Sequence, residues 1–343
     1  MARTASPARA NNFDSLRTIA ALMVLVSHAF PLSGHDAAEP IRRLSHGQTT
    51  AGTIAVAIFF IISGYLITMS FERNPVARSF IMNRVLRLVP ALAVVVLFLT
   101  FVAGPLLSRD ATSLYLRQPA TYEFPIVAVT LVHFYDGLPG VFLHNPFPRS
   151  VDGSLWTLHY EVACYVLVFL LGVSHILNKY VTAFLFLVGL VAMVSGVGHH
   201  VTEFGTYFLA GAVIHLWKPP IRGDLAAASA LVWIAALLWR GVTPASATAG
   251  AYLVIFLAVS PSIRLPRLAR WGDLSYGIYI WAFPVQQSIA WLRGGHVAWY
   301  VDAAASLPIV LGLALLSWHL VEAPALALKR RRAYAPVVAA ERA

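Results

Sequence analysis

Arg17 and His28 are eleven positions apart in the mostly apolar stretch FDSLRTIAALMVLVSHAF. On a helix, eleven steps of about 100° return the second side chain to nearly the same face as the first, about 16 Å further along the axis. An imidazole in such surroundings can act as a general base or a nucleophile in acyl transfer. The alternative is an arginine that anchors the helix end and a histidine that hydrogen-bonds a neighbouring helix. The spacing alone leaves both interpretations open.

A third ionisable residue, Glu161, lies inside the apolar segment 154–172, at a depth comparable to that of His28. A carboxylate beside an imidazole fixes the tautomer of the ring and stabilises its protonated form, the base-and-orienter arrangement of acyl-transfer enzymes. We therefore predict that Glu161 orients His28. A hydrogen bond that only holds two helices together is the alternative.

Arg84 and Arg87, in SFIMNRVLRLVP, are three residues apart and share one face of a helix. A pair of guanidinium groups suits bidentate contacts with phosphate oxygens. Basic residues also gather at the cytoplasmic ends of membrane helices without any ligand. The pair is therefore a candidate phosphate site that the pattern alone does not establish.

The segment FFIISGYLI places Ser63, Gly64 and Tyr65 in a predicted membrane helix. Gly64 predicts a close contact between helices, and Tyr65 brings a hydroxyl group into the membrane. Ser63 lacks the flanking pattern of a hydrolase nucleophile elbow, so we do not predict it as a nucleophile.

Other polar residues give weaker signals. Asp273 is predicted to cap the helix that follows it, and Glu322 to join a cytoplasmic ion-pair cluster with the basic run 329–332. His199 and His200 are adjacent, and two adjacent histidines are poor chelators. We predict no metal site.

These residues are set in a strongly apolar chain of 343 residues, 59% apolar and 12% charged, with a mean hydropathy of +0.72. Soluble proteins contain about 45–50% apolar and about 25% charged residues. The excess apolar surface must face lipid, which excludes a soluble enzyme. The net charge of +10 comes from clusters between apolar runs, so we predict no nucleic-acid partner. The single cysteine, Cys164, excludes an intramolecular disulfide.

Ten apolar stretches are long enough to cross about 30 Å of hydrocarbon. They are 15–33, 51–71, 88–107, 154–172, 181–197, 202–217, 225–241, 246–260, 272–292 and 300–321. The stretch 125–134 is too short, and we predict that it is interfacial or re-entrant. The sequence therefore predicts an all-α polytopic membrane protein with one domain over 1–343, its spans over about 15–321 and a basic cytoplasmic tail over 322–343.

The distribution of basic residues predicts the orientation. With the N-terminus in the cytoplasm, 18 of the 25 Lys and Arg residues fall on the cytoplasmic side. This bias predicts that both termini are cytoplasmic. The alternative is that residues 1–29 form a cleaved signal peptide, because a basic start and a short apolar run precede a small-residue site at 27–29. Cleavage there would remove His28.

Taken together, six motifs resemble the acyltransferase-3 family of integral membrane acyltransferases. They are FDSLRTIAALMVLVSHAF, IAVAIFFIISGYLI, SFIMNRVLRLVPAL, DGSLWTLHYEVACY, WGDLSYGIYIWAFPVQQ and SWHLVEAPALALKRR, in that order. The resemblance implies a ten-helix domain of the bacterial inner membrane. It also implies transfer of an acyl group, most often acetyl, from acetyl-CoA or another acyl-CoA to a surface polysaccharide or a lipid-linked sugar.

The resemblance also assigns roles. His28 matches the essential histidine of the family, Arg17 its partner arginine, and Glu161 the acidic residue that follows SLWTL. Arg84 and Arg87 match the Arg-x-x-Arg pair that is thought to contact the donor. To this predicted donor site we add Arg17 and also Tyr65.

Many members have a histidine before a Pro-Val pair in the ninth helix. This chain has Ala282 and Phe283 there, so no catalytic role is assigned to that position. The loop 108–153, which contains Phe142, Phe147 and Tyr135, is either an ordered lid over a carbohydrate acceptor or a plain interfacial loop.

A proton-coupled secondary transporter is the alternative function, since buried arginine, histidine and glutamate side chains also occur in such carriers. Transporters usually contain two related halves, and this sequence shows no internal repeat. The sequence therefore favours the acyltransferase.

Overall fold

The computed structural model describes residues 11–131, 137–266 and 268–328, and no β-strand occurs within those ranges. Within them, six helical segments are long and apolar enough to cross a membrane: Phe13–Leu32, Ala51–Arg73, Ala77–Leu107, Gly153–Val173, Val242–Val259 and Trp299–Leu328. Two shorter apolar helices are α9 (Lys179–Val194) and α11 (Gly223–Leu238). The protein is therefore all-helical and built around membrane-length helices, as predicted.

Each of the six segments contains one main α-helix, and in four of the segments shorter helices extend it. The main helices are α1 (Phe13–Leu32), α3 (Ala51–Arg73), α4 (Ala77–Phe98), α8 (Leu158–Val173), α13 (Ala251–Val259) and α15 (Trp299–Ser317). The short elements are η1 (Asp36–Ala38), α2 (Pro40–Leu44), η2 (Leu99–Ala103), α5 (Gly104–Leu107), α6 (Thr112–Tyr115), η3 (Gly153–Thr157), α12 (Val242–Ala245), η4 (Ser246–Gly250), η5 (Leu268–Trp271) and η6 (Trp318–Glu322).

All ten predicted spans coincide with helix, including α10 (His199–Trp217) and α14 (Ser275–Leu292), but the number of ten crossings and the orientation stay predictions. The last helical segment runs to Leu328, past the predicted end of the final span, and residues 329–343 of the predicted tail lie outside the described residues. The stretch 125–134, predicted to be interfacial or re-entrant, begins inside α7 (Pro119–Thr130), and α7 packs against α4. Residues 132–134 of this stretch lie outside the described residues.

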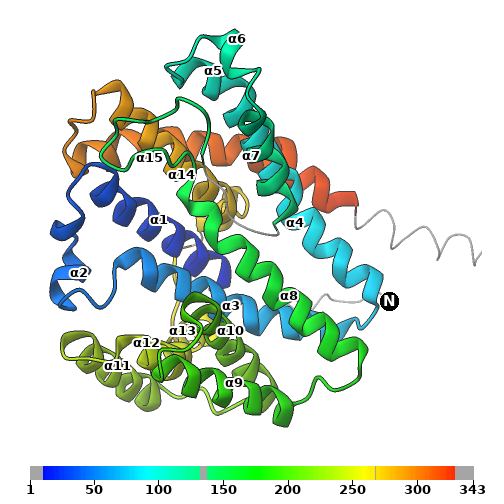
Figure 1. The fold of residues 1–343 in the computed structure, drawn as a ribbon. Coiled ribbons are helices and arrows are strands. Elements are labelled where there is room, and N and C mark those ends of the chain that lie inside the picture. The colour runs from blue at the N-terminus through cyan, green and yellow to red at the C-terminus, as the bar shows by residue number, and fades with distance from the viewer. Residues whose placement is uncertain (1–10, 132–136, 267, 329–343) are drawn as a thin grey trace, which may run out of the picture.

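α1 packs between α3 on one side and α14 and α15 on the other (Figure 1). α14 runs parallel to α1. Arg17 meets Asp273 where the two helices begin, and further along Gln286 of α14 donates a hydrogen bond to the Leu25 carbonyl oxygen. Helices α9 to α13 form the opposite side of the molecule, beyond α3 (Figure 1).

A close crossing joins α3 and α10. A Cβ atom on Gly64 would lie 1.8 Å from the Phe208 carbonyl oxygen, and one on Gly211 would lie 2.0 Å from the Ile61 carbonyl oxygen. Only glycine leaves room for these backbones to touch. The predicted close helix contact at Gly64 is confirmed.

α14 is buried on almost every side, so it can carry amide side chains within a membrane domain. Gln287 is fully buried, and its Nε2 donates to the carbonyl oxygens of Phe147, at 2.7 Å, and Ser150, at 2.8 Å. Its Oε1 accepts from Asn145 Nδ2 at 2.7 Å. One side chain thus ties the loop 137–153 to the helix beside α1.

The aromatic residues of the predicted lid have different environments. Phe142 is buried in the core, with 1% of its surface exposed, whereas Phe147 is 42% exposed. Tyr135 lies outside the described residues. The loop is therefore anchored by Phe142 and presents Phe147 at its surface.

Candidate active site

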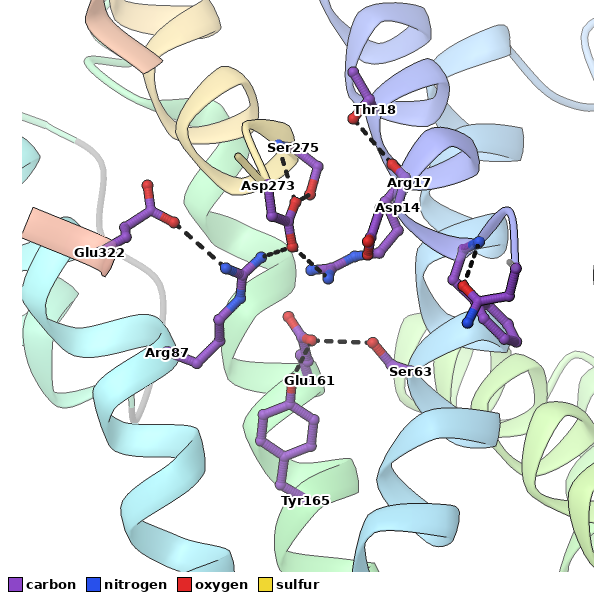
Figure 2. A network of polar contacts seen from close by, with 12 residues as sticks. Asp14, Arg17, Thr18, Ser63, Arg87, Glu161, Tyr165, Asp273, Ser275 and Glu322 are labelled. Atoms are coloured by element: carbon purple, nitrogen blue, oxygen red, sulfur yellow. Dashed lines mark hydrogen bonds and ion pairs between the residues drawn. The ribbon is translucent and has the colours of Figure 1, made fainter. Parts of the chain in front are cut away.

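Four charged side chains form one network near the start of α1 and α14 (Figure 2). Oδ2 of Asp273 lies 3.0 Å from Nη1 of Arg17 and 2.7 Å from Nη2 of Arg87. Nη1 of Arg87 lies 3.5 Å from Oε2 of Glu322. The two positive and two negative charges balance, and this group of four residues is called the ion bridge below.

Asp273 reaches both arginines because of the tight turn before α14. Gly272 adopts a φ of +118°, and a Cβ atom there would lie 2.0 Å from Nε1 of Trp318, so only glycine fits. Oδ1 of Asp273 accepts hydrogen bonds from the hydroxyl of Ser275, at 2.6 Å, and from its backbone N–H, at 3.3 Å. The N-cap of α14 is Leu274, without a side-chain cap hydrogen bond, so Asp273 stands one residue before the predicted capping position and bonds the first residue of the helix.

The bridging role of Asp273 was not predicted. The predicted cluster of Glu322 with the basic run 329–332 stays a prediction, because those four residues lie outside the described residues. Glu322 has only 2% of its surface exposed, and its described partners are Arg87 and the hydroxyl of Ser317, which donates to Oε1 at 3.0 Å. The helix continues past this residue to Leu328, and the carboxylate is buried inside the bundle. One feature of the sequence could have indicated these ion pairs. Asp273 and Glu322 are acidic residues in or beside apolar segments, and no partners were predicted for the arginines of the same chain.

Arg84 and Arg87 do not share partners, although they share a helix face. Arg84 donates to the hydroxyl of Ser70 at 2.8 Å, and its guanidinium carbon lies 5.1 Å from the ring centre of Phe80 and 5.6 Å from that of Tyr165. Nε of Arg84 is buried and has no hydrogen-bond partner among the described residues. Arg84 is therefore the member of the pair that keeps hydrogen-bonding capacity.

Glu161 lies beside the ion bridge (Figure 2). Its Oε1 accepts hydrogen bonds from the hydroxyl of Ser63, at 3.2 Å, and from the hydroxyl of Tyr165. These three residues line a cavity of about 50 Å³ together with Arg17 and Arg87. A cavity of this size holds only a few water molecules.

His28 lines a second and larger cavity, of about 320 Å³, near the end of α1. Its ring meets the ring of Phe283 edge-on, with 5.4 Å between centroids, and Phe283 meets Phe147 at 5.9 Å. Nδ1 of His28 is buried and has no hydrogen-bond partner within the described ranges. Because His28 also lines the cavity, its imidazole is a candidate to accept a proton or to attack an acyl group.

The structure separates residues that were predicted to act together. Glu161 bonds Ser63 and Tyr165 and lines the small cavity, so the predicted contact between Glu161 and His28 is absent from the described interactions. Depth in the membrane can be estimated from sequence position, but the helix face that meets a given neighbour cannot.

The two cavities nevertheless adjoin, because Val56 and Tyr279 line both of them. Tyr65, predicted at the donor site, lines neither. Its ring packs 5.4 Å from that of Phe13 and 4.9 Å from that of His215. No group of three or more His, Cys, Asp or Glu side chains converges as metal ligands in the part of the chain that the structure describes.

Comparisons with known proteins place the chain among acyltransferases. The family model described as an acyltransferase domain matches residues 11–319. The chain is 31% identical over 339 residues to a protein of Shigella phage Sf6 named O-acetyl transferase, covering 92% of this chain and 95% of the relative. It is 29% identical over 363 residues to nodulation protein 10 of Rhizobium leguminosarum bv. viciae, covering 93% and 94%.

No solved structure matches the chain. The family model spans nearly all of the helical bundle. It covers three of the four residues of the ion bridge, all but Glu322, and every residue that lines the His28 cavity. The chain is therefore a multi-pass membrane protein that belongs to the acyltransferase-3 family.

Proposed function

We propose that this protein is a membrane O-acyltransferase that moves an acyl group, acetyl in the simplest case, from acetyl-CoA or another acyl-CoA to a hydroxyl group of a surface polysaccharide or lipid-linked sugar. The observation that carries the proposal is the pair of adjoining cavities, one beside the ion bridge and one at His28. A donor entering beside the arginines and an acceptor entering beside the histidine would meet at the wall formed by Val56 and Tyr279. In the proposed orientation the arginines and both termini face the cytoplasm of a bacterium, across its inner membrane.

The donor half of the proposal relies on arginine, because coenzyme A carries phosphate groups and guanidinium groups bind them in bidentate fashion. Arg84 suits this role, since its Nε is buried without a partner. Arg17 and Arg87 already pair with Asp273, and the cavity of about 50 Å³ beside them is too small for a thioester and its arm. Donor binding therefore requires the ion bridge to open.

The proposed base is His28. Its ring nitrogen takes the proton of the acceptor hydroxyl while the oxygen attacks the thioester carbonyl and forms the new C–O bond. The C–S bond then breaks, and the imidazolium returns the proton to the departing sulfur. Arg17 and Glu161 lie in the neighbouring cavity, so in this proposal Glu161 positions the thioester rather than the imidazole, and Arg17 joins the arginines that bind the donor phosphates.

A two-step route uses the same residue. The ring nitrogen attacks the thioester, coenzyme A leaves as the thiol, and the acceptor hydroxyl takes the acyl group from the acyl-imidazole in a second step. Labelled acyl groups trapped on His28 in the absence of acceptor would support this route. Direct transfer predicts no such adduct.

Similarity supports the reaction class. One relative is named an O-acetyl transferase, and its likeness to this chain extends over almost the whole length of both proteins. Membership of an acyltransferase family favours this function over the transporter that buried charges alone would also allow.

The direct test is to measure ester-linked acyl groups on purified surface polysaccharide by NMR, before and after mild base. The strains are wild type, a deletion, and the deletion complemented with the intact gene, His28→Ala or His296→Ala. His296 is an exposed histidine outside both cavities and serves as the matched control.

We expect esters with the intact gene and with His296→Ala, and none with His28→Ala. Esters restored by His28→Ala would refute the assigned base while leaving the reaction class. Esters unchanged by the deletion, together with no release of thiol from acetyl-CoA by membranes, would refute the acyltransferase proposal.

A further inference from the structure

The cavity that contains His28 is acidic. The side chains of Asp36, Glu39 and Glu203 line it, and neither lysine nor arginine is among its described lining residues. The arginines of the ion bridge line the other cavity, and Arg17 lies about 16 Å from His28 along the axis of α1. Arginines therefore line only the cavity beside the ion bridge, whereas the cavity at His28 is lined by carboxylates.

Glu39 and Asp36 each bond backbone N–H groups or a cation of the fold. Glu39 is 2% exposed and accepts hydrogen bonds from the backbone N–H groups of Ala51, at 3.0 Å, and Arg42. Asp36 pairs with Nη1 of Arg42 at 2.8 Å. One cation at the edge of the cavity thus offsets one of its three negative charges.

Glu203 is the carboxylate with free capacity. Its Oε1 accepts from the hydroxyl of Tyr207 at 3.0 Å, and its Oε2 lies 3.8 Å from Nδ1 of His200. A carboxylate has about four acceptor sites. Glu203 can therefore accept further hydrogen bonds from hydroxyl or ammonium groups of a ligand.

An aromatic platform stands in the same cavity. The indole of Trp156 packs 4.7 Å from the ring of His200, 5.3 Å from that of Phe204 and 5.9 Å from that of Tyr160. These neighbours hold the indole in one orientation, and both Trp156 and His200 line the cavity. A fixed ring beside a hydrogen-bond acceptor complements a pyranose, which presents C–H groups on its faces and hydroxyl groups on its edge.

We infer that the acceptor sugar at His28 is an uncharged or amine-bearing pyranose, bound by Trp156 on its C–H face and by Glu203 through its hydroxyl groups, and that sugars bearing a carboxylate or phosphate are excluded. The inference rests on the proposed function. The volume of about 320 Å³ falls at the lower end of small-molecule sites, at about 300–1,000 Å³. A negative sugar would meet Glu39 and Glu203 there without an arginine or lysine on the cavity wall to offset them, and such repulsion lowers the affinity by about tenfold or more.

The first test locates the gene-dependent ester. Polysaccharide from wild-type and deletion strains is compared by two-dimensional NMR, and the sugar residue that carries the ester is identified. An ester on a neutral or amino sugar supports the inference. An ester on a uronic acid or on a phosphorylated sugar overturns it while the proposed function stands, whereas the absence of any gene-dependent ester overturns both.

The second test measures the two Michaelis constants separately in purified protein, with acetyl-CoA and with unacetylated polysaccharide from the deletion strain. We expect Glu203→Gln to raise KM for the polysaccharide about tenfold and leave KM for acetyl-CoA unchanged. Trp156→Ala is expected to do the same and Trp156→Phe to restore most of the binding. Glu123→Gln, an exposed carboxylate on α7 outside the cavity, is the control.

A wild-type acceptor KM in both Glu203→Gln and Trp156→Ala would overturn the assignment of the sugar site. A loss of transfer with unchanged acceptor KM would also overturn it, because it would place these residues in the chemistry or the fold rather than in acceptor recognition.

Discussion

Replacing Asp273 by asparagine removes the carboxylate that joins Arg17 to Arg87 and keeps the size of the side chain. The change breaks ion pairs of 3.0 and 2.7 Å and leaves two guanidinium groups facing each other. Removing one partner of a buried ion pair costs about 3–5 kcal/mol, because a buried charge is left unpaired. The side chains of Arg17 and Arg87 are 23% and 15% exposed, and Arg87 keeps Glu322. We therefore expect the free energy of unfolding to fall by about 3 kcal/mol, the lower end of that range.

A double-mutant cycle isolates the ion pair from the other effects of the substitution. Asp273→Asn, Arg87→Met and the double variant are unfolded in mixed detergent micelles. The double variant should lose at least about 1 kcal/mol less than the two single losses combined, since Arg87→Met removes a charge that Asp273→Asn leaves unpaired. Ser275→Ala is the control, because it removes only a hydrogen bond to Asp273 Oδ1, worth about 1 kcal/mol. Free energies that simply add in the double variant would refute the ion bridge as a stabilising contact.

Three further substitutions test the packing, the loop and the donor site. Gly64→Ala should lower the free energy of unfolding by about 3 kcal/mol, because its Cβ would lie 1.8 Å from a carbonyl oxygen. Gly205→Ala is the matched control, since nothing lies within 4 Å of a Cβ there, and equal stabilities of the two variants would contradict the close crossing of α3 and α10. Gln287→Leu should speed hydrogen exchange and proteolysis of the loop 137–153, since three hydrogen bonds are lost; an unchanged loop would contradict the anchor. Arg84→Lys should raise KM for acetyl-CoA about tenfold. The loss of stability should be small, because no carboxylate is among the described partners of Arg84. A KM equal to that of the wild type would exclude Arg84 from the donor site.

The positions of the helices could be predicted because membrane spans are a local property of sequence. A run of about 20 apolar residues must satisfy its backbone as helix in lipid, whatever it packs against. The close helix contact at Gly64 could also be predicted, since a glycine among large apolar residues of a membrane helix usually marks a close approach of another helix. The structure has a backbone carbonyl oxygen at the place where its Cβ would be.

The partners of the charged residues could not be predicted, since they depend on which helix faces meet. Asp273 and Arg87 are 186 positions apart in the chain, and nothing local to either residue indicates the other. Glu161 was placed at the depth of His28, yet its carboxylate bonds Ser63 and Tyr165 beside the ion bridge. Depth follows from counting residues, whereas the rotation of α8 follows from its packing against α3 and α10.

The ion bridge and a bound donor compete for the same guanidinium groups. An arginine in a membrane domain is always charged and costly when unpaired, so Arg17 and Arg87 require anions in every state. Asp273 and Glu322 supply them in the structure, and in the proposed function the phosphates of acyl-CoA would replace them. Asp273→Asn weakens one side of this competition, and we expect it to lower KM for acetyl-CoA even as it destabilises the fold. A KM that rises would instead identify Asp273 as a group that the donor needs, and the bridge would then be part of the donor site rather than its competitor.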